Sequence, residues 1–260
     1  MAALLMAGDG AQEIDMQPNG KTALVTGASR GIGAAIARRL SADGFALVVN
    51  YAGGRDAADA LVSELRAAGG QAEAIQADVS DAVAVRRLFD EAERTFGAVD
   101  VLVNNAGIMR LAPLADSDDA LFDTQVAVNL KGTFNTLREA ARRLRAGGRI
   151  VNLSSSVVGL LPPTYAVYAA TKAGVEALTH VFVKELRGRD ITVNAVAPGP
   201  TATDLFLNGK SEEIVERLAK QPPLQRLGQP TDIAGAVAFL AGPDGAWVNG
   251  QTLRVNGGII

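Results

Sequence analysis

The chain contains no cysteine, and histidine and tryptophan occur once each. A chain without thiols forms no disulfide and has no cysteine nucleophile. At 260 residues it is long enough to bury about three-quarters of its unfolded surface, so it needs neither a disulfide nor a structural metal for stability. No apolar run reaches the ~18 residues of a membrane span. We therefore expect a folded domain in a reducing compartment, the cytoplasm.

The chain also lacks a large excess of positive or negative charge. The chain has 25 Lys and Arg against 28 Asp and Glu, a formal net charge of -3. The basic residues are mostly interspersed with acids, which excludes the usual footprint of a nucleic-acid-binding protein. No cluster of metal-ligand residues occurs, so no metal site is expected. Residues 1–20 lack the basic start of a signal peptide, and Asp9 interrupts their apolar run. We expect them to form a loose extension ahead of one domain at 21–260.

From Lys21 onward, short apolar or β-branched runs alternate with longer segments of helical periodicity. Such alternation with short connections predicts right-handed βαβ crossovers, hence an α/β fold with a parallel sheet and helices on both faces. The expected strands are 22–26, 46–51, 72–76, 101–104, 149–154, 192–197 and 251–255. The expected helices are 33–43, 57–68, 82–96, 118–144, 165–187 and 231–240.

A long insert at about 199–229 breaks this alternation. It contains a possible helix at 211–220, with Ser211 as N-cap and glutamates in the first turn. Long inserts in compact domains are often lids or binding loops, so we expect a lid here.

Distinctive residues come directly after the expected strands. The carboxyl ends of parallel strands meet at one edge of the sheet, where ligands of such folds bind. The segments that this rule places together are 27–33, 50–55, 78–79, 104–107, Ser155 and 198–199. The sequence therefore predicts one site at this edge.

The first of these segments is rich in glycine. Thr26–Gly33 reads Thr-Gly-Ala-Ser-Arg-Gly-Ile-Gly and stands between an apolar strand and an expected helix. In that context backbone N–H groups and a helix N-terminus suit a pyrophosphate, although the spacing differs from the common Gly-x-Gly-x-x-Gly pattern. We expect phosphate binding here rather than a plain tight turn.

Tyr168 and Lys172 are spaced i and i+4, so they project from the same face of a helix. An ammonium in this position is expected to lower the pKa of the phenol toward the working pH, as a general acid requires. Carbonyl reduction requires a proton donor of this kind beside a nicotinamide site.

These motifs resemble those of the short-chain dehydrogenase/reductase family, over about 21–258. The motifs that carry the resemblance are TGASRGIG at 26–33, NNAG at 104–107, VNLKG around Asn129, NLSSS at 152–156, YAATK at 168–172 and VNAVAPGP at 193–200. The resemblance implies a doubly wound Rossmann fold with seven strands, a nicotinamide dinucleotide and a catalytic tetrad. Carried over to this chain, the tetrad is Asn129, Ser155, Tyr168 and Lys172.

The residue types fit the roles that the resemblance implies. Tyr168 would protonate the carbonyl oxygen, and Ser155 would hydrogen-bond the same oxygen and stabilise the developing alkoxide. Lys172 would hold the nicotinamide ribose. Three serines stand in a row at 154–156, and the spacing selects the middle one. Asn129 would help to hold a water that replenishes the proton, or it would merely satisfy backbone groups.

The choice of cofactor depends on the end of the second strand. An acid there usually binds the free 2′-hydroxyl of NAD, and this chain has Asn50 instead. Arg30, with or without Arg55, suits a 2′-phosphate, although either is also an ordinary surface charge. We therefore favour NADP(H) over NAD(H). Thr201 and Thr203 would bind the cofactor or serve as ordinary caps. The residues assigned to the cofactor are Gly27, Ser29, Arg30, Gly31, Ile32, Gly33, Asn50, Tyr51, Asp78, Val79, Asn105, Ala106, Gly107, Tyr168, Lys172, Pro198, Gly199, Thr201 and Thr203.

For the substrate, the signal is apolar. Apolar residues occur in the loop 157–165, at Met109 and Leu111, and at 205–207. They would form a pocket for a ketone with hydrophobic arms, or they would pack a lid or a subunit interface. We expect an NADPH-dependent carbonyl reductase acting on a ketone or 3-oxoacyl thioester. The alternatives are an NAD-dependent alcohol or polyol dehydrogenase and a non-catalytic dinucleotide-sensing regulator.

Two surface features bear on partners. By resemblance, a homotetramer or dimer would assemble through 118–144, 165–187 and the last strand. A basic cluster would dock an acidic carrier protein or simply form a solvated helix end, since cations favour helix C-termini. Its members are Arg138, Arg142, Arg143, Arg145 and Arg149. Neither a nucleic acid nor a membrane is expected as a partner.

Overall fold

The computed structural model describes residues 19–260, so most of the expected extension at 1–20 lies outside the described residues. Seven parallel strands form one sheet in the order β3-β2-β1-β4-β5-β6-β7. The strand order reverses between β1 and β4, which is the switch point where doubly wound folds bind ligands. The expected fold is confirmed. The strands are β1 (Thr22–Val25), β2 (Ala46–Tyr51), β3 (Ala72–Gln76), β4 (Val101–Asn104), β5 (Arg149–Leu153), β6 (Thr192–Pro198) and β7 (Thr252–Val255).

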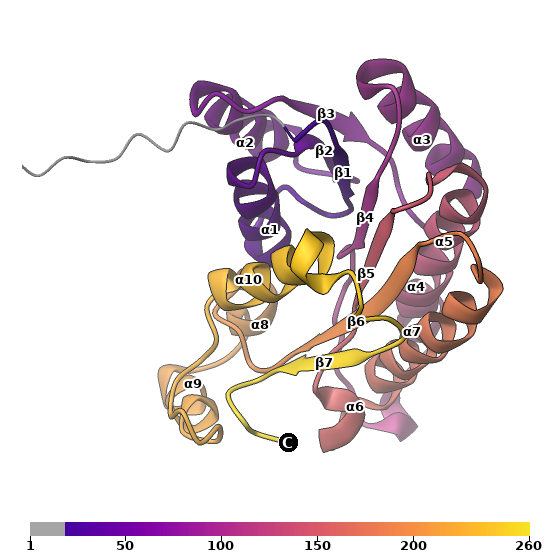
Figure 1. Cartoon of the computed structure of the whole chain (residues 1–260). Helices are drawn as coiled ribbons and strands as arrows, with labels where there is room; N and C mark the ends of the chain where they lie inside the picture. The colour runs from indigo at the N-terminus through magenta and orange to yellow at the C-terminus, as the bar shows by residue number, and fades with distance from the viewer. Residues whose placement is uncertain (1–18) are drawn as a thin grey trace, which may run out of the picture.

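Helices cover both faces of the sheet (Figure 1). Helices α1, α2 and α10 pack on one face, and α3, α5 and α7 pack on the other. The helices are α1 (Gly31–Ala42), α2 (Arg55–Ala67), α3 (Ala82–Phe96), α4 (Asp119–Gln125), α5 (Gly132–Arg143), α6 (Val157–Leu160), α7 (Ala166–Glu185), α8 (Asp204–Leu207), α9 (Glu212–Ala219) and α10 (Pro230–Ala241).

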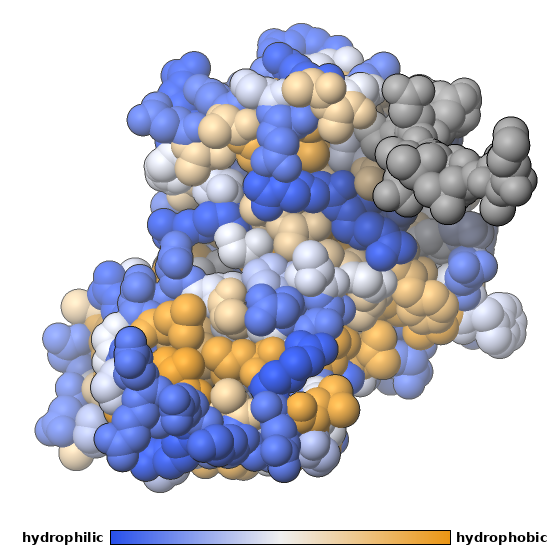
Figure 2. Space-filling view, turned by 90° about the vertical axis from the view of Figure 1, so that its left-hand side faces the viewer, coloured by the Kyte–Doolittle hydropathy of each residue, from blue (hydrophilic) through white to orange (hydrophobic). Residues whose placement is uncertain are grey.

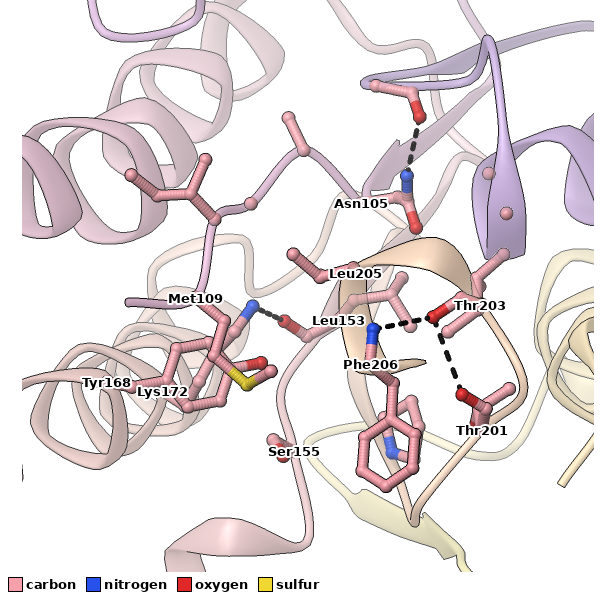
Figure 3. Close-up of a pocket in the computed structure, with 18 of the residues that line it drawn as sticks. Asn105, Met109, Leu153, Ser155, Tyr168, Lys172, Thr201, Thr203, Leu205 and Phe206 are labelled. Atoms are coloured by element: carbon pink, nitrogen blue, oxygen red, sulfur yellow. Dashed lines mark hydrogen bonds between the residues drawn. The ribbon is translucent and has the colours of Figure 1, made fainter. Parts of the chain in front are cut away.

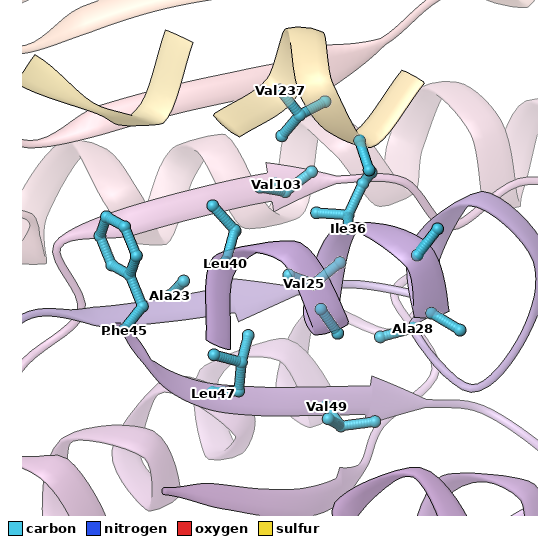
Figure 4. Close-up of a cluster of buried hydrophobic side chains, with 14 of the residues drawn as sticks. Ala23, Val25, Ala28, Ile36, Leu40, Phe45, Leu47, Val49, Val103 and Val237 are labelled. Carbon is cyan, nitrogen blue, oxygen red and sulfur yellow. The ribbon is translucent and has the colours of Figure 1, made fainter. Parts of the chain in front are cut away.

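The core consists of two layers, one on each face of the sheet. Side chains alternate along a strand, so Val25 packs under α1 and α10 whereas its neighbour Leu24 packs toward α3 and α5. Figure 4 shows Ile36 and Leu40 of α1 above the strands, with Val237 of α10 beside them. Because both faces are covered, the strands read as continuous apolar runs, and this is why they were predictable.

The expected helix 118–144 is present as one continuous helical segment, but it is not α-helical throughout. Helix α4 passes into a π-helical turn at Val126–Lys131 and then into α5. The i→i+5 pairing of a π turn differs from the α-helical spacing on which the prediction rested, so the prediction did not include it. Such turns are frequent at functional sites, and Asn129 lies on this one.

The insert between β6 and α10 holds two short helices. Ser211 caps α9 as predicted, and its hydroxyl accepts the backbone N–H of Ile214 at 3.4 Å. Helices α6 and α8 were not predicted, because four residues carry no periodic signal.

Within residues 19–260, no helix is both long and apolar enough to cross a membrane. The same part of the chain brings no three His, Cys, Asp or Glu side chains together as a metal site.

Candidate active site

A cavity of about 670 Å³ lies at the carboxyl edge of the sheet, bounded by the loops that follow β1 to β6 (Figure 3). All the residues assigned to the cofactor line it, and so do Ser155, Tyr168 and Lys172. Asn129 does not line it, although it lies close behind the wall. The fold thus brings the separate sequence motifs to one place.

The glycine turn between β1 and α1 is tightly packed. Gly27 and Gly31 have φ of +60° and +56°, a region that favours glycine. A Cβ on Gly33 would lie 2.5 Å from both Asn105 Nδ2 and the Gly27 carbonyl oxygen. No side chain caps the N-terminus of α1, so its first N–H groups are available to an anion. The turn therefore fits a pyrophosphate.

Asn50 lies at the end of β2 and lines the cavity as predicted, but its side chain is engaged in internal contacts. Its side chain is 1% exposed and points into the fold. The amide nitrogen donates to the carbonyl oxygens of Ile75 and Ala77, and the amide oxygen accepts the N–H of Gly27. Asn50 thus ties β2 to β3 and to the glycine turn, and its amide is occupied by these contacts rather than free for a ribose.

Asn105 has a similar structural role. Its amide nitrogen donates to the carbonyl oxygens of Thr26 and Gly27, at 2.9 Å each. The Thr26 hydroxyl in turn accepts the backbone N–H groups of Asn105 and Ala106, at 3.0 Å each. The loops after β1 and β4 are therefore joined into one rigid floor.

The two candidate arginines differ. Arg30 is exposed in the cavity wall and makes no side-chain hydrogen bond or ion pair with any residue of the described range 19–260. Arg55 lies outside the wall and pairs with Asp59 at 3.3 Å. Of the two, only Arg30 offers a free guanidinium to a ligand in the cavity.

The threonines after β6 act as local caps. Thr203 Oγ1 accepts the N–H of Phe206 at 3.3 Å and so begins α8. The Thr201 hydroxyl donates to the Gly199 carbonyl oxygen at 2.9 Å. Both side chains still line the cavity. The capping role is therefore present whether or not they also contact a cofactor.

Tyr168 and Lys172 lie side by side on α7, as their spacing predicted. The Lys172 side chain is buried, its Nζ donates to the Leu153 carbonyl oxygen at 2.7 Å, and it lies 5.8 Å from the centre of the Tyr168 ring (Figure 3). Burial lowers the pKa of Lys172 to about 8.

The expected lowering of the tyrosine pKa is not met in this structure. Burial raises the pKa of Tyr168 to about 12, and a hydrogen bond with the Ser155 side chain offsets only part of that rise. The neighbouring phenol of Tyr165 raises the pKa further. Desolvation outweighs the stabilisation of a phenolate here, because Tyr168 is half-buried and the Lys172 beside it is buried.

The structure distinguishes the three consecutive serines. Ser154 Oγ donates to Glu176 Oε1 at 2.6 Å, and Ser156 Oγ donates to the Ala197 carbonyl oxygen at 3.1 Å. Ser155 Oγ accepts the N–H of Val157 at 3.3 Å, and its side chain is also hydrogen-bonded with the Tyr168 phenol. Ser155, the residue selected by spacing, is thus the serine whose hydroxyl faces the tyrosine.

Asn129 is completely buried, with both ends of its amide engaged. Its oxygen accepts the N–H of Ile108 at 2.8 Å, and its nitrogen donates to the Ile108 carbonyl oxygen at 2.9 Å and to Thr171 Oγ1 at 3.2 Å. The side chain therefore clamps the loop after β4 against α7. This is the backbone-satisfying role that the sequence left open.

The other end of the cavity is apolar. Leu218 and Gln221 line it from the end of α9, and sequence reasoning missed both, although the apolar side of an amphipathic helix was the available signal. Leu111 and Leu207 were expected there and are not in the wall. Figure 2 shows hydrophobic surface gathered on the lower part of the face that carries α8 and α9. The expected residues that do line the cavity are Met109, Val157, Leu160, Pro162, Tyr165, Leu205 and Phe206.

The basic cluster is largely engaged in internal contacts. Arg143 pairs with Asp90 at 2.7 Å and with Glu93 and Glu139 at 3.1 Å each. Arg145 pairs with Asp100 at 2.6 Å. These contacts favour the helix-end interpretation over a docking surface.

The structure combines a doubly wound sheet, an uncapped glycine turn at its switch point, and a Tyr–Lys pair whose lysine is buried. These features place the protein among the Rossmann-fold oxidoreductases. Comparison with known proteins agrees. A family model described as Enoyl-(Acyl carrier protein) reductase matches residues 27–260. The chain belongs to the short-chain dehydrogenase/reductase family.

Individual relatives cover nearly the whole chain. A short-chain type dehydrogenase/reductase of Picea abies is 46% identical over 249 residues, 92% of each chain. The 3-oxoacyl-[acyl-carrier-protein] reductase FabG of Staphylococcus aureus is 47% identical over 241 residues, 92% of this chain and 98% of that protein. A short-chain dehydrogenase of Burkholderia cenocepacia, solved in complex with NADP, is 41% identical with a TM-score of 0.88 and covers 94% of this chain and 98% of its own.

Proposed function

We propose that the protein is an NADPH-dependent carbonyl reductase with Tyr168 as the general acid. The observation that carries the proposal is the convergence of Ser155, Tyr168 and Lys172 on the cavity whose other end is the glycine turn. Bound NADPH would supply the hydride. The proton then comes from the chain itself, because the Tyr168 phenol, with its raised pKa, is protonated at neutral pH.

The serine and the lysine complete the arrangement. Ser155, whose hydroxyl lies beside the Tyr168 phenol, donates a hydrogen bond to the carbonyl oxygen of the substrate and stabilises the charge that develops there. Lys172 would hold the nicotinamide ribose through the part of its ammonium not engaged by Leu153. Asn129 contributes by holding the loop after β4, which supports the nicotinamide end of the cavity.

For the cofactor, NADP(H) is proposed over NAD(H). Arg30 is a free guanidinium in the cavity wall, and no acid occupies the end of β2, where Asn50 is buried. A bidentate guanidinium suits a 2′-phosphate. The relative from Burkholderia cenocepacia, whose structure contains NADP, supports the same choice.

The proposed substrate is a ketone with an apolar arm or a 3-oxoacyl thioester. Apart from Asp204, the residues that α8, α9 and the turn after them contribute to the wall are uncharged. An apolar wall with few polar groups favours neutral, hydrophobic substrates over sugars. The Staphylococcus relative named as a 3-oxoacyl-[acyl-carrier-protein] reductase supports the thioester as a member of the test panel.

A homo-oligomer forms part of the proposal. Large apolar side chains are exposed on the elements expected to form the interface: Phe134 on α5, Val181 on α7 and Leu253 on β7. Trp247, just before β7, is 97% exposed. Exposed apolar groups of this size mark interaction surfaces. Sedimentation or light scattering of the purified chain tests this part, and a monomer would contradict it.

The experiment that tests the reaction is a panel assay. Oxidation of NADPH, followed by the loss of nicotinamide absorbance, is measured with acetoacetyl thioesters, hydrophobic ketones and sugars, with NADH in parallel. We expect turnover of a ketone or thioester with NADPH, and a loss on the order of 1,000-fold in Tyr168→Phe with NADPH binding retained. Preference for NADH would refute the cofactor assignment. Binding of NADPH without turnover of any carbonyl would instead favour the sensing role.

A further inference from the structure

Helix α7 holds the end of β5 at two successive residues. Lys172 Nζ donates to the Leu153 carbonyl oxygen at 2.7 Å, and one turn later Glu176 Oε1 accepts the Ser154 hydroxyl at 2.6 Å. Ser154 is 4% exposed and Glu176 is half-buried, so this hydrogen bond is partly shielded from water. The second contact attaches the residue before Ser155 to the helix that carries Tyr168.

The residue after Ser155 is attached elsewhere. The Ser156 hydroxyl donates to the Ala197 carbonyl oxygen at 3.1 Å and accepts Asn256 Nδ2 at 3.0 Å. Its backbone N–H donates to the Pro198 carbonyl oxygen at 2.9 Å. These bonds connect the serine segment to β6 and to the C-terminal segment, and none of them reaches α7. Of the two serines that flank Ser155, only Ser154 is therefore bonded to the tyrosine helix, through Glu176.

We infer that Glu176 is a positioning residue that fixes the Ser155 hydroxyl relative to the Tyr168 phenol. This inference rests on the proposed carbonyl reduction, in which both hydroxyls must reach the same oxygen. Glu176 is not part of the cavity wall, so it acts through Ser154 and not on the substrate. Donors to a developing oxyanion lose their effect when they are displaced by a fraction of an ångström, so a distant anchor affects the rate.

The test is a double-mutant cycle on Ser154 and Glu176, assayed with NADPH and the best ketone or thioester of the panel. We expect Ser154→Ala and Glu176→Ala each to lower kcat roughly tenfold. The double variant should be no slower than either single variant, because both remove the same contact. Glu176→Gln keeps an oxygen acceptor and should restore kcat to within about twofold of the wild type.

Three measurements separate positioning from simple loss of stability. The Kd of NADPH, from its fluorescence, should stay unchanged in every variant. The control Glu185→Ala alters an exposed glutamate on the same helix and should leave kcat unchanged. A lower Tm with kcat within about twofold of the wild type, in Glu176→Ala and Ser154→Ala alike, would mean a structural role only and overturn the inference.

Failure of the inference differs from failure of the proposed function. A wild-type protein that turns over no carbonyl refutes the proposed function and removes the inference with it. A wild-type protein that reduces a ketone, with Glu176→Ala equally fast or Glu176→Gln as slow as Glu176→Ala, refutes the inference alone.

Discussion

The two ends of the cavity are held in different ways. At the glycine-turn end, Asn50, Asn105 and Thr26 join three loops through hydrogen bonds of about 2.9 to 3.3 Å, and their side chains are buried or nearly so. At the apolar end, neither α8 nor α9 contains a single buried residue. Their fixed points are the caps Thr203 and Ser211.

This difference matches what each end has to recognise. The cofactor is the same molecule in every turnover, so a preorganised floor binds it at low entropic cost. Segments with few buried contacts open more easily, and binding elements that adapt are drawn from such segments. We infer that the glycine-turn end, which binds the cofactor, resembles the same region of other dinucleotide-binding folds. The end formed by α8 and α9 instead determines which ketone is accepted. The predictions below test this division.

The largest effect should come from breaking the rigid end. Gly33→Ala places a Cβ 2.5 Å from the Gly27 carbonyl oxygen and Asn105 Nδ2, so the turn must shift. We expect NADPH affinity to fall on the order of 100-fold. The control is Gly235→Ala on α10, where the added Cβ meets only a side-chain atom of Arg39 at 3.9 Å. Fluorescence titration with NADPH measures both, and equal affinities would contradict a rigid turn.

The next largest effect should come from removing Arg30, the one free guanidinium at the rigid end among the described residues. Arg30→Ala should weaken NADPH binding roughly 10- to 100-fold, since charge-assisted hydrogen bonds to a phosphate are lost. NADH, which lacks the 2′-phosphate, should bind as before. Arg55→Ala is the matched control, because that guanidinium pairs with Asp59 outside the wall. A similar loss of affinity for NADPH and NADH would show that Arg30 does not recognise the 2′-phosphate.

At the adaptable end, substitutions should change substrate selection and leave the cofactor alone. Phe206→Ala should raise KM for hydrophobic ketones roughly tenfold, as an apolar wall is removed. Leu207→Ala on the same short helix is the control, because Leu207 is not in the wall. The Kd of NADPH should be the same in both. A change in that Kd would mean that the two ends are coupled.

The smallest expected effect is a pH dependence at the junction of the two ends. Burial lowers the pKa of Lys172 to about 8, so its ammonium is present below that pH and lost as pH rises through it. NADPH affinity should therefore fall several-fold between about pH 7 and pH 9. Lys172→Met should abolish this dependence, whereas Lys184→Met, on the exposed side of the same helix, should retain it. A flat profile for the wild type would contradict the role of Lys172 in binding.

Whether a feature of the fold or the site could be predicted from the sequence depends on how far apart along the chain the interacting residues lie. The strands were predictable because full burial on both faces leaves continuous apolar runs, and the edge that holds the site follows from parallel order alone. Ser155, Tyr168 and Lys172 were found by spacing and family motifs, and the cavity contains all three. The capping of α9 by Ser211 was also predicted, because a cap depends on neighbours in sequence.

Other features involve residues far apart in the chain, and no local pattern reports them. Asn50 reads as a substitute for an acid, but its amide is bonded to β3 and the glycine turn. The pKa of Tyr168 reads as lowered by Lys172, but burial raises it to about 12. Leu218 and Gln221 belong to the wall only because α9 folds back over the cavity.

By itself, then, the sequence determined the order of strands and helices, the edge where the site lies and the residue types that meet there. Those properties come from periodicity, turn chemistry and the geometry of βαβ crossovers, which act over short stretches of chain. The tertiary structure alone decided the hydrogen-bond partners of the three serines, which of the two candidate arginines is unpaired, and how strongly burial shifts the pKa values of Tyr168 and Lys172. Each of these depends on the exclusion of water and on partners brought together from distant parts of the chain.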